Sequence, residues 1–68
     1  MIAKALGDAA RELRVELEIS QEALAGLAGI ERSHMGKIER GEHMPALTAV
    51  WKLSCALGIT ASQLLAVA

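Results

Sequence analysis

The segment between Glu31 and Gly41 carries side chains that can bind anions and hydrogen-bond acceptors. At about 100° per residue of a helix, Met35 and Ile38 define one apolar side that must be buried. The opposite side and its flanks carry cationic, imidazole and hydroxyl groups: Arg32, Ser33, His34, Lys37 and Arg40. Arginine and lysine bind phosphates and the O6 and N7 acceptors of guanine, and serine serves either kind of base edge. An ordinary solvated helix face has the same composition, so the surrounding elements must distinguish the two interpretations.

The residues just before this segment predict a tight turn between two short helices. Ser20 is a good N-cap, Glu22 complements the helix dipole in the first turn, and the helix ends near Ala28. Gly29 can adopt the positive φ that such a turn needs, and Ala25 is small enough for two helices to cross closely. Two short helices joined in this way form a helix-turn-helix, whose second helix can enter the major groove of DNA.

Apolar periodicity predicts the helices that must hold this pair in place. A first helix over residues 3–17 should bury one face, formed by Ile2, Leu6, Ala9 or Ala10, Leu13 and Leu17. After a loop at Pro45, a fourth helix follows the apolar pattern Leu47, Val50, Leu53, Ser54 and Leu57.

Helix ends are also marked in the sequence. The helix from about Glu31 to Glu39 should stop at Gly41, and the fourth helix should end with Gly58 at its C′ position. Thr60 and Gln63 form a T-x-x-Q capping box that begins a last helix through Val67. No strand pattern is present, so the prediction is an all-α fold of five helices in one domain over residues 1–68.

The chain resembles the Cro/phage-repressor helix-turn-helix family, also called the xenobiotic-response-element class. The resemblance is carried by Ser20-Gln21-Glu22-Ala23-Leu24-Ala25, Ala28-Gly29-Ile30 and Ile38-Glu39-Arg40-Gly41. Pro45-Ala46-Leu47, Lys52-Leu53 and Ala56-Leu57-Gly58 resemble the fourth helix of the family. The similarity covers roughly residues 4–66. It implies a lambda-repressor-like DNA-binding domain with a helix-turn-helix core at about 20–41 and a recognition helix at about 31–39.

The resemblance also implies roles for individual residues. Arg32, Ser33 and Lys37 match positions that touch bases. Positions expected to meet the DNA backbone are Gln21, His34, Arg40 and His43, although a glutamine at position 21 can instead brace the recognition helix. Arg14 and Glu39 match a structural pair that joins the first helix to the end of the third.

Four residues depart from the family pattern. Glu18 stands where glycine is usual, and costs about 1 kcal/mol if the backbone there is left-handed. Glu31 replaces the usual serine or threonine cap of the recognition helix, and brings negative charge close to DNA. Gly36 lies inside the recognition helix, on or near its outward face, and Met44 replaces a polar residue before Pro45.

Composition excludes several classes of protein. The net charge is −1 and the pI about 6.1, which is unusual for a nucleic-acid binder, although acids dominate the first third of the chain and cations the recognition helix. The single cysteine, Cys55, cannot form an internal disulfide and fits a reducing cytoplasm. There is no signal peptide, no membrane-spanning run, and no catalytic or metal-binding spacing, so we expect no enzyme, cofactor, metal or small-molecule ligand.

One recognition helix reads about half a site, so specific binding requires a two-fold dimer on a palindromic duplex. The candidate dimer residues are Trp51, Cys55, Ile59, Leu64, Leu65 and Val67, some of which must instead close the core of the monomer. The leading hypothesis is a homodimeric cytoplasmic transcriptional regulator, of the repressor or controller kind, that binds double-stranded DNA. The alternative is a protein-interaction module, such as an antitoxin-like domain, that keeps the fold without binding DNA tightly.

Overall fold

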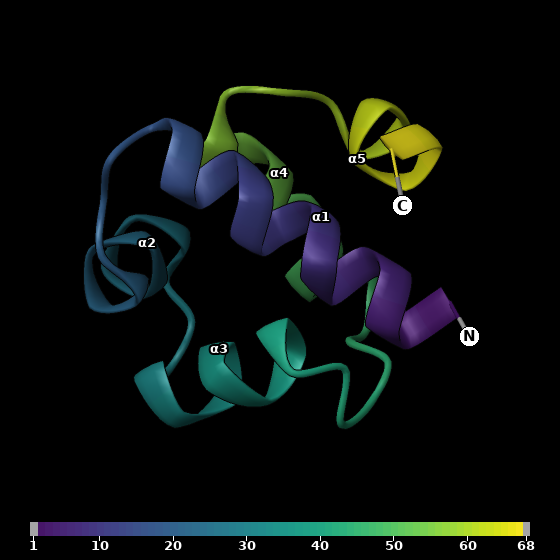
Figure 1. The fold of residues 1–68 in the computed structure, drawn as a ribbon, viewed down its shortest axis with the longest axis horizontal. Helices are drawn as coiled ribbons and strands as arrows, with labels where there is room; N and C mark the ends of the chain where they lie inside the picture. Colours follow the sequence, from purple (N-terminus) through teal and green to yellow (C-terminus); the bar gives the residue numbers. More distant parts are fainter. Residues whose placement is uncertain (1, 68) are drawn as a thin grey trace.

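The computed structural model describes residues 2–67, and the side chains of residues 2–66. Five helices make up this part of the chain: α1 (Ile2–Glu16), α2 (Gln21–Ala28), α3 (Arg32–Glu39), α4 (Leu47–Leu57) and α5 (Ala61–Val67). No strand occurs between residues 2 and 67, so the predicted all-α class of five helices is confirmed. α1 runs across the molecule with α3 beneath it, and α2 packs against both α3 and α4 (Figure 1).

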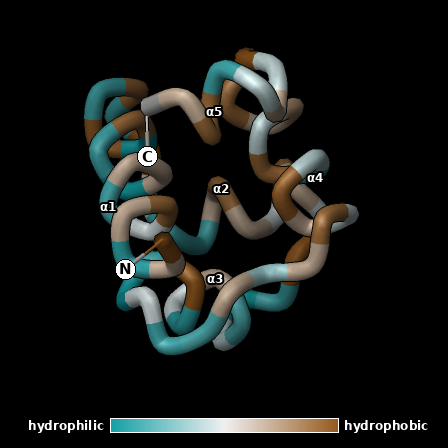
Figure 2. Tube along the Cα trace, turned by 90° about the vertical axis from the view of Figure 1, so that its right-hand side faces the viewer, coloured by the Kyte–Doolittle hydropathy of each residue, from teal (hydrophilic) through white to brown (hydrophobic). Residues whose placement is uncertain are grey.

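The core lies where the five helices meet. Its fully buried large side chains come from every helix: Leu6, Leu24, Met35, Ile38, Val50, Leu53 and Leu64. The trace of α3 and the turn after it is largely hydrophilic, whereas that of α4 is largely hydrophobic (Figure 2). α3 contributes two apolar side chains to the core, Met35 and Ile38, and exposes polar residues on its other side.

Local capping determines where the helices begin and end. The hydroxyl of Ser20 accepts a hydrogen bond from the Ala23 N–H at 3.0 Å, which begins α2. Gly29 and Gly58 end α2 and α4 at φ 68° and 76°, in the left-handed conformation that favours glycine. The Thr60 N–H donates to Gln63 while the Gln63 N–H donates to Thr60, at 2.9 and 3.0 Å. These ends agree with the sequence-based predictions.

Three apolar residues predicted to lie on inward helix faces are exposed. Ile2 is 62% exposed and Leu17 is 49% exposed, because Ile2 begins α1 and Leu17 lies in the turn beyond its last residue, Glu16. Leu47, the first residue of α4, is 76% exposed. The helical spacing was right for the middle of each helix and wrong at these ends, where no neighbouring helix covers the side chain.

α1 and α3 approach each other closely at Gly7. A side chain there would place its Cβ 2.3 Å from the carbonyl oxygen of Ile38 and 2.9 Å from that of Glu39. Only glycine therefore allows the backbone of α1 to lie against the C-terminal end of α3. The same end is held by side chains as well.

A buried carboxylate joins three helices at this point. Glu39, at the end of α3, is 5% exposed and accepts two hydrogen bonds from Arg14 of α1, at 2.8 and 3.1 Å. Gln21, the first residue of α2, donates a third at 3.3 Å, and Arg14 also donates to the Ile19 carbonyl at 3.0 Å. The expected Arg14–Glu39 contact is therefore present, and Gln21 takes part in it as a brace.

Removing Arg14 should destabilise the fold strongly, because Glu39 would stay buried without a counter-charge. We expect Arg14→Leu to lower the free energy of unfolding by about 3 kcal/mol. Arg11→Leu, which removes an exposed arginine of the same helix, should change it by less than about 0.5 kcal/mol. Urea denaturation of both variants measures the difference, and a loss below about 1 kcal/mol for Arg14→Leu would place this pair among ordinary surface ion pairs.

Glu18 has a φ of 58°, so it adopts the left-handed backbone that a side chain disfavours. Replacing it with glycine should raise the free energy of unfolding by about 1 kcal/mol. The matched control is Glu16→Gly, in the last turn of α1, which should lower stability by up to about 1 kcal/mol. The melting temperatures of the two variants should change in opposite directions. A lower melting temperature for Glu18→Gly would show that the left-handed backbone at Glu18 is not strained.

Candidate nucleic-acid interface

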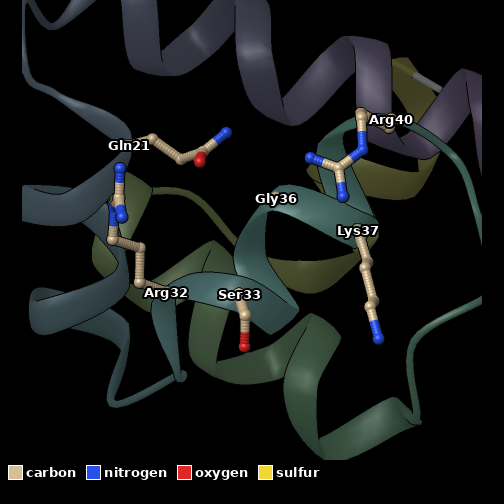
Figure 3. Close-up of a pocket in the computed structure, with 6 residues that line it drawn as sticks. All are labelled: Gln21, Arg32, Ser33, Gly36, Lys37 and Arg40. Atoms are coloured by element: carbon tan, nitrogen blue, oxygen red, sulfur yellow. The ribbon is translucent and has the colours of Figure 1, made fainter.

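The outer surface of α3 is hollowed next to the start of α2. The hollow has a volume of about 280 Å³ and is lined by Gln21, Arg32, Ser33, Gly36, Lys37 and Arg40 (Figure 3). Three of these residues are cations and none is acidic. The two helices of the turn therefore create a concave, positively charged surface, although the whole chain carries a net charge of −1.

α3 is divided into a buried side and an exposed side. Met35 and Ile38 are buried in the core, as predicted from the spacing. The exposed residues are the three predicted base-contact residues and one predicted backbone-contact residue: Arg32, Ser33, Lys37 and Arg40. Ser33 and Lys37 point away from Gln21, whereas Arg32 turns toward α2 (Figure 3).

Gly36 lines the hollow on the outer surface of α3, on or near the outward face where the sequence placed it. It is buried beneath the guanidinium of Arg40, and a Cβ at this position would lie 2.9 Å from Nη1 of that arginine. The position faces α2, because it lies one turn after Arg32 and one turn before Arg40 on the same side of the helix. Spacing by four residues along α3 is the signal that could have identified this arrangement.

Carboxylates surround the cationic surface without entering the hollow. Glu22 lies 3.7 Å from Arg32, Glu42 accepts a hydrogen bond from Nε of Arg40, and Glu31 accepts one from the hydroxyl of Ser33. The hydrogen bond from Arg40, supported by the positive charges of Arg40, Lys37 and His43, lowers the pKa of Glu42. Glu42 therefore stays ionised at neutral pH beside Arg40. The sequence reasoning did not single out Glu22 and Glu42 as partners of these arginines.

The start of α3 departs from the family pattern, as expected from Glu31. Glu31 is the N-cap residue, but its side chain makes no capping hydrogen bond to the backbone. Its carboxylate is used by Ser33 instead. The first turn of α3 therefore lacks the side-chain cap that Ser20 supplies to α2.

Of the four predicted backbone-contact residues, Gln21 and Arg40 line the hollow, whereas His34 and His43 do not. Gln21 donates to Glu39 through Nε2, so the structure places it as a brace of α3. His34, half-buried on α3, stacks on His43 of the following loop, with ring centroids 5.1 Å apart and the planes 10° from parallel. Gly41, with φ 69°, turns the chain close to Lys4 of α1 and so brings this loop back beside α3.

The predicted dimer residues fall into three groups. Trp51, Cys55 and Leu65 are exposed, and Ile59 is half-buried against the core. Leu64 is fully buried, so its assignment to a dimer surface was wrong: it closes the core of the monomer where α5 packs against α1 and α4. The side chain of Val67 lies outside the described residues. Leu47, which was not among the predicted dimer residues, precedes Trp51 and Cys55 at four-residue spacing and is exposed like them, so the three form an apolar stripe along α4.

Neither a metal-binding cluster nor a membrane-spanning helix occurs among the described residues. No group of three or more histidine, cysteine, aspartate or glutamate side chains in residues 2–66 is arranged to hold a metal ion. None of the five helices in this part of the chain is long and apolar enough to cross a membrane.

Comparison with known proteins agrees with this geometry. The family described as helix-turn-helix matches residues 11–64 of the chain. The solved structure of the restriction-modification controller protein C.AhdI from Aeromonas hydrophila is 40% identical, with a TM-score of 0.87 over 91% of this chain and 94% of that one.

Two further relatives have names that refer to transcription or control. The control protein C.MunI from a Mycoplasma species is 36% identical over 59 residues, which is 85% of this chain and 80% of the relative. A hypothetical transcription factor of Neisseria meningitidis is 40% identical over 55 residues, and the match spans about half (52%) of its length. The chain therefore belongs to the Cro/phage-repressor class of the helix-turn-helix family and is similar to restriction-modification controller proteins.

Proposed function

We propose that the chain binds double-stranded DNA sequence-specifically as a homodimeric transcriptional regulator, with α3 in the major groove. The observation that carries the proposal is the cationic hollow on the outer surface of α3, which has no acidic residue in its lining. The opposite side of α3 is anchored in the core, so the surface that remains free is the one a groove can receive. The relatives named as controller proteins and as a transcription factor support the same assignment.

The direction of each side chain suggests a division of roles. Ser33 and Lys37 point outward from α3 and are placed to meet base edges (Figure 3). Arg32 stands at the first turn of α3, where recognition helices also contact bases. We assign contacts with the DNA backbone to His34, to His43, which stacks on it from the loop after α3, and to Arg40 at the end of α3.

A dimer would place two recognition helices about one turn of DNA apart, roughly 34 Å. The exposed residues Leu47, Trp51 and Cys55 form a stripe on α4, and Leu65 lies exposed on α5, which packs against α4. Contiguous exposed apolar patches often mark surfaces that associate with another chain. We assign this surface to the dimer, and the cytoplasm as the place of action because Cys55 is a free thiol.

One observation favours the alternative of a protein-interaction module. Three carboxylates, those of Glu22, Glu31 and Glu42, stand next to the surface that should approach phosphates, and they repel DNA. In such a module the positive hollow would serve an acidic protein partner instead. Selecting bound sequences from a pool of random DNA duplexes distinguishes the two functions.

Several rounds of selection from a pool of random duplexes, followed by sequencing, test the proposal. We expect an enriched palindrome with half-sites about 10 base pairs apart, because two copies of α3 must read successive turns of the groove. Affinity for the selected duplex should fall steeply and linearly with log salt concentration, since phosphate contacts release counterions. No enrichment, together with binding that salt does not change, would favour the interaction module.

Replacing Lys37 tests the orientation of α3 in the groove. Lys37→Ala should cost about 1–3 kcal/mol on the selected duplex and relax the base preference at one position of each half-site. Arg11→Ala removes the same charge from an exposed position of α1 that does not line the hollow, and should leave that preference unchanged. Repeating the selection with each variant measures both effects; an unchanged preference in Lys37→Ala would exclude it as a base reader.

A further inference from the structure

Gly36 interrupts a row of side chains that would otherwise fill one side of α3. Arg32, Gly36 and Arg40 follow one another at four-residue spacing, so they lie on the same side of the helix. The two arginines therefore stand on either side of a position that carries no side chain. We call this feature the Gly36 notch; its floor is the backbone of Gly36 and its walls are Arg32, Arg40 and Gln21 (Figure 3).

The guanidinium of Arg40 is directed into the notch. A methyl group built on Gly36 would lie 2.9 Å from Nη1 of Arg40 and 3.5 Å from Oε1 of Gln21. Glu42 accepts the hydrogen bond from Nε of Arg40, on the other edge of the same guanidinium. Arg40 therefore folds back over α3 because position 36 has no side chain to prevent it.

Arg32 forms the other wall of the notch. Its side chain turns toward the start of α2, where its Nε lies 3.7 Å from Glu22, and away from the direction of Ser33 and Lys37 (Figure 3). Both residues of that ion pair are more than 70% exposed, so another anion can easily displace Glu22 from Arg32. Gln21 donates Nε2 to Glu39 and has its Oε1 on the side of Gly36, so its amide N–H group is used by Glu39 and is not a hydrogen-bond donor to a bound anion.

A phosphodiester is the ligand that this arrangement suits. Guanidinium groups bind phosphate oxygens with paired hydrogen bonds, and position 36 adds no side chain between the two arginines. The hollow of about 280 Å³ that contains the notch has room for one such group, and no carboxylate lines it.

We propose that the Gly36 notch binds one backbone phosphate of DNA in each half-site, held between Arg32 and Arg40. The assignment rests on the proposed DNA-binding function and deepens it. It makes Arg32 a phosphate-binding residue, where the sequence suggested a base contact, and leaves base reading to Ser33 and Lys37. It also gives a reason for a glycine inside a recognition helix.

Filling the notch tests the proposal, because stability and affinity should move in opposite directions. Alanine is the better helix former, and the methyl of Gly36→Ala would meet only the flexible ends of Arg40 and Gln21, so the melting temperature should rise by about 4 °C. The affinity for the selected duplex should fall about tenfold with no change in the preferred bases. Gly26→Ala is the matched control: a Cβ at Gly26 of α2 has nothing within 4 Å, so the melting temperature should rise and the affinity should stay constant.

Neutral methylphosphonate linkages, placed one at a time along the selected duplex, locate the phosphate. In the unmodified protein one linkage per half-site should lower the affinity about tenfold, and the same linkage should have little effect on Gly36→Ala. Titration of inorganic phosphate without DNA should give only weak binding. Saturation at micromolar phosphate would identify a site for a small phosphate compound and overturn the DNA assignment.

The other outcomes are equally decisive. A selected duplex bound equally well by Gly36→Ala and the unmodified protein would overturn the notch while leaving the proposed function intact. A changed base preference in Gly36→Ala would make the notch a base-reading site, and a lower melting temperature would make Gly36 a packing residue; either result overturns the phosphate assignment. Failure of the unmodified protein to select any duplex would instead overturn the proposed function on which the notch rests.

Discussion

The carboxylate of Glu39 is the interaction on which the geometry of the recognition surface depends. Two hydrogen bonds from Arg14 and one from Gln21 tie the end of α3 to α1 and to the start of α2. A buried charge is tolerated only while its partners remain in place, so this contact fixes the three helices relative to one another. Gly7 contributes by letting the backbone of α1 rest on the carbonyl groups at the same end of α3.

The surface that faces outward follows from this anchoring. With Met35, Ile38 and Glu39 buried, the exposed residues of α3 can only be those of the opposite side. Gln21 links the anchor to the hollow, because one atom of its amide binds Glu39 while another faces Gly36. The buried brace and the positively charged hollow are therefore two sides of one arrangement.

The whole chain is weakly negative, whereas the hollow on α3 is positive. The positions of the carboxylates explain how a chain with this net charge can still present a surface that suits DNA. Carboxylates stand at the rim and pair with Arg32 and Arg40, whereas the hollow between them has only cations and neutral groups. Exposed ion pairs contribute little to stability and exchange readily, so the dense phosphates of a duplex can displace them. Acidic groups at the rim reduce attraction to any duplex, which leaves affinity to depend on how well α3 fits the bases.

Features that depend on residues within about one helical turn could be predicted from the sequence. The caps at Ser20, Gly29, Gly58 and Thr60, and the buried middles of α1, α3 and α4, all follow from neighbours along the chain. Burial at Leu47 and Leu64, in contrast, depends on which helix packs over each side chain; tertiary packing left Leu47 exposed and covered Leu64. The same reason applies to Gly36, whose position was assigned from the wheel of one helix, whereas its surroundings are set by Gln21 of α2 and by the path of Arg40 across α3. Hydrogen bonds between neighbouring residues can be predicted from short sequence motifs. A surface formed by two helices cannot, because it depends on how the helices pack against each other.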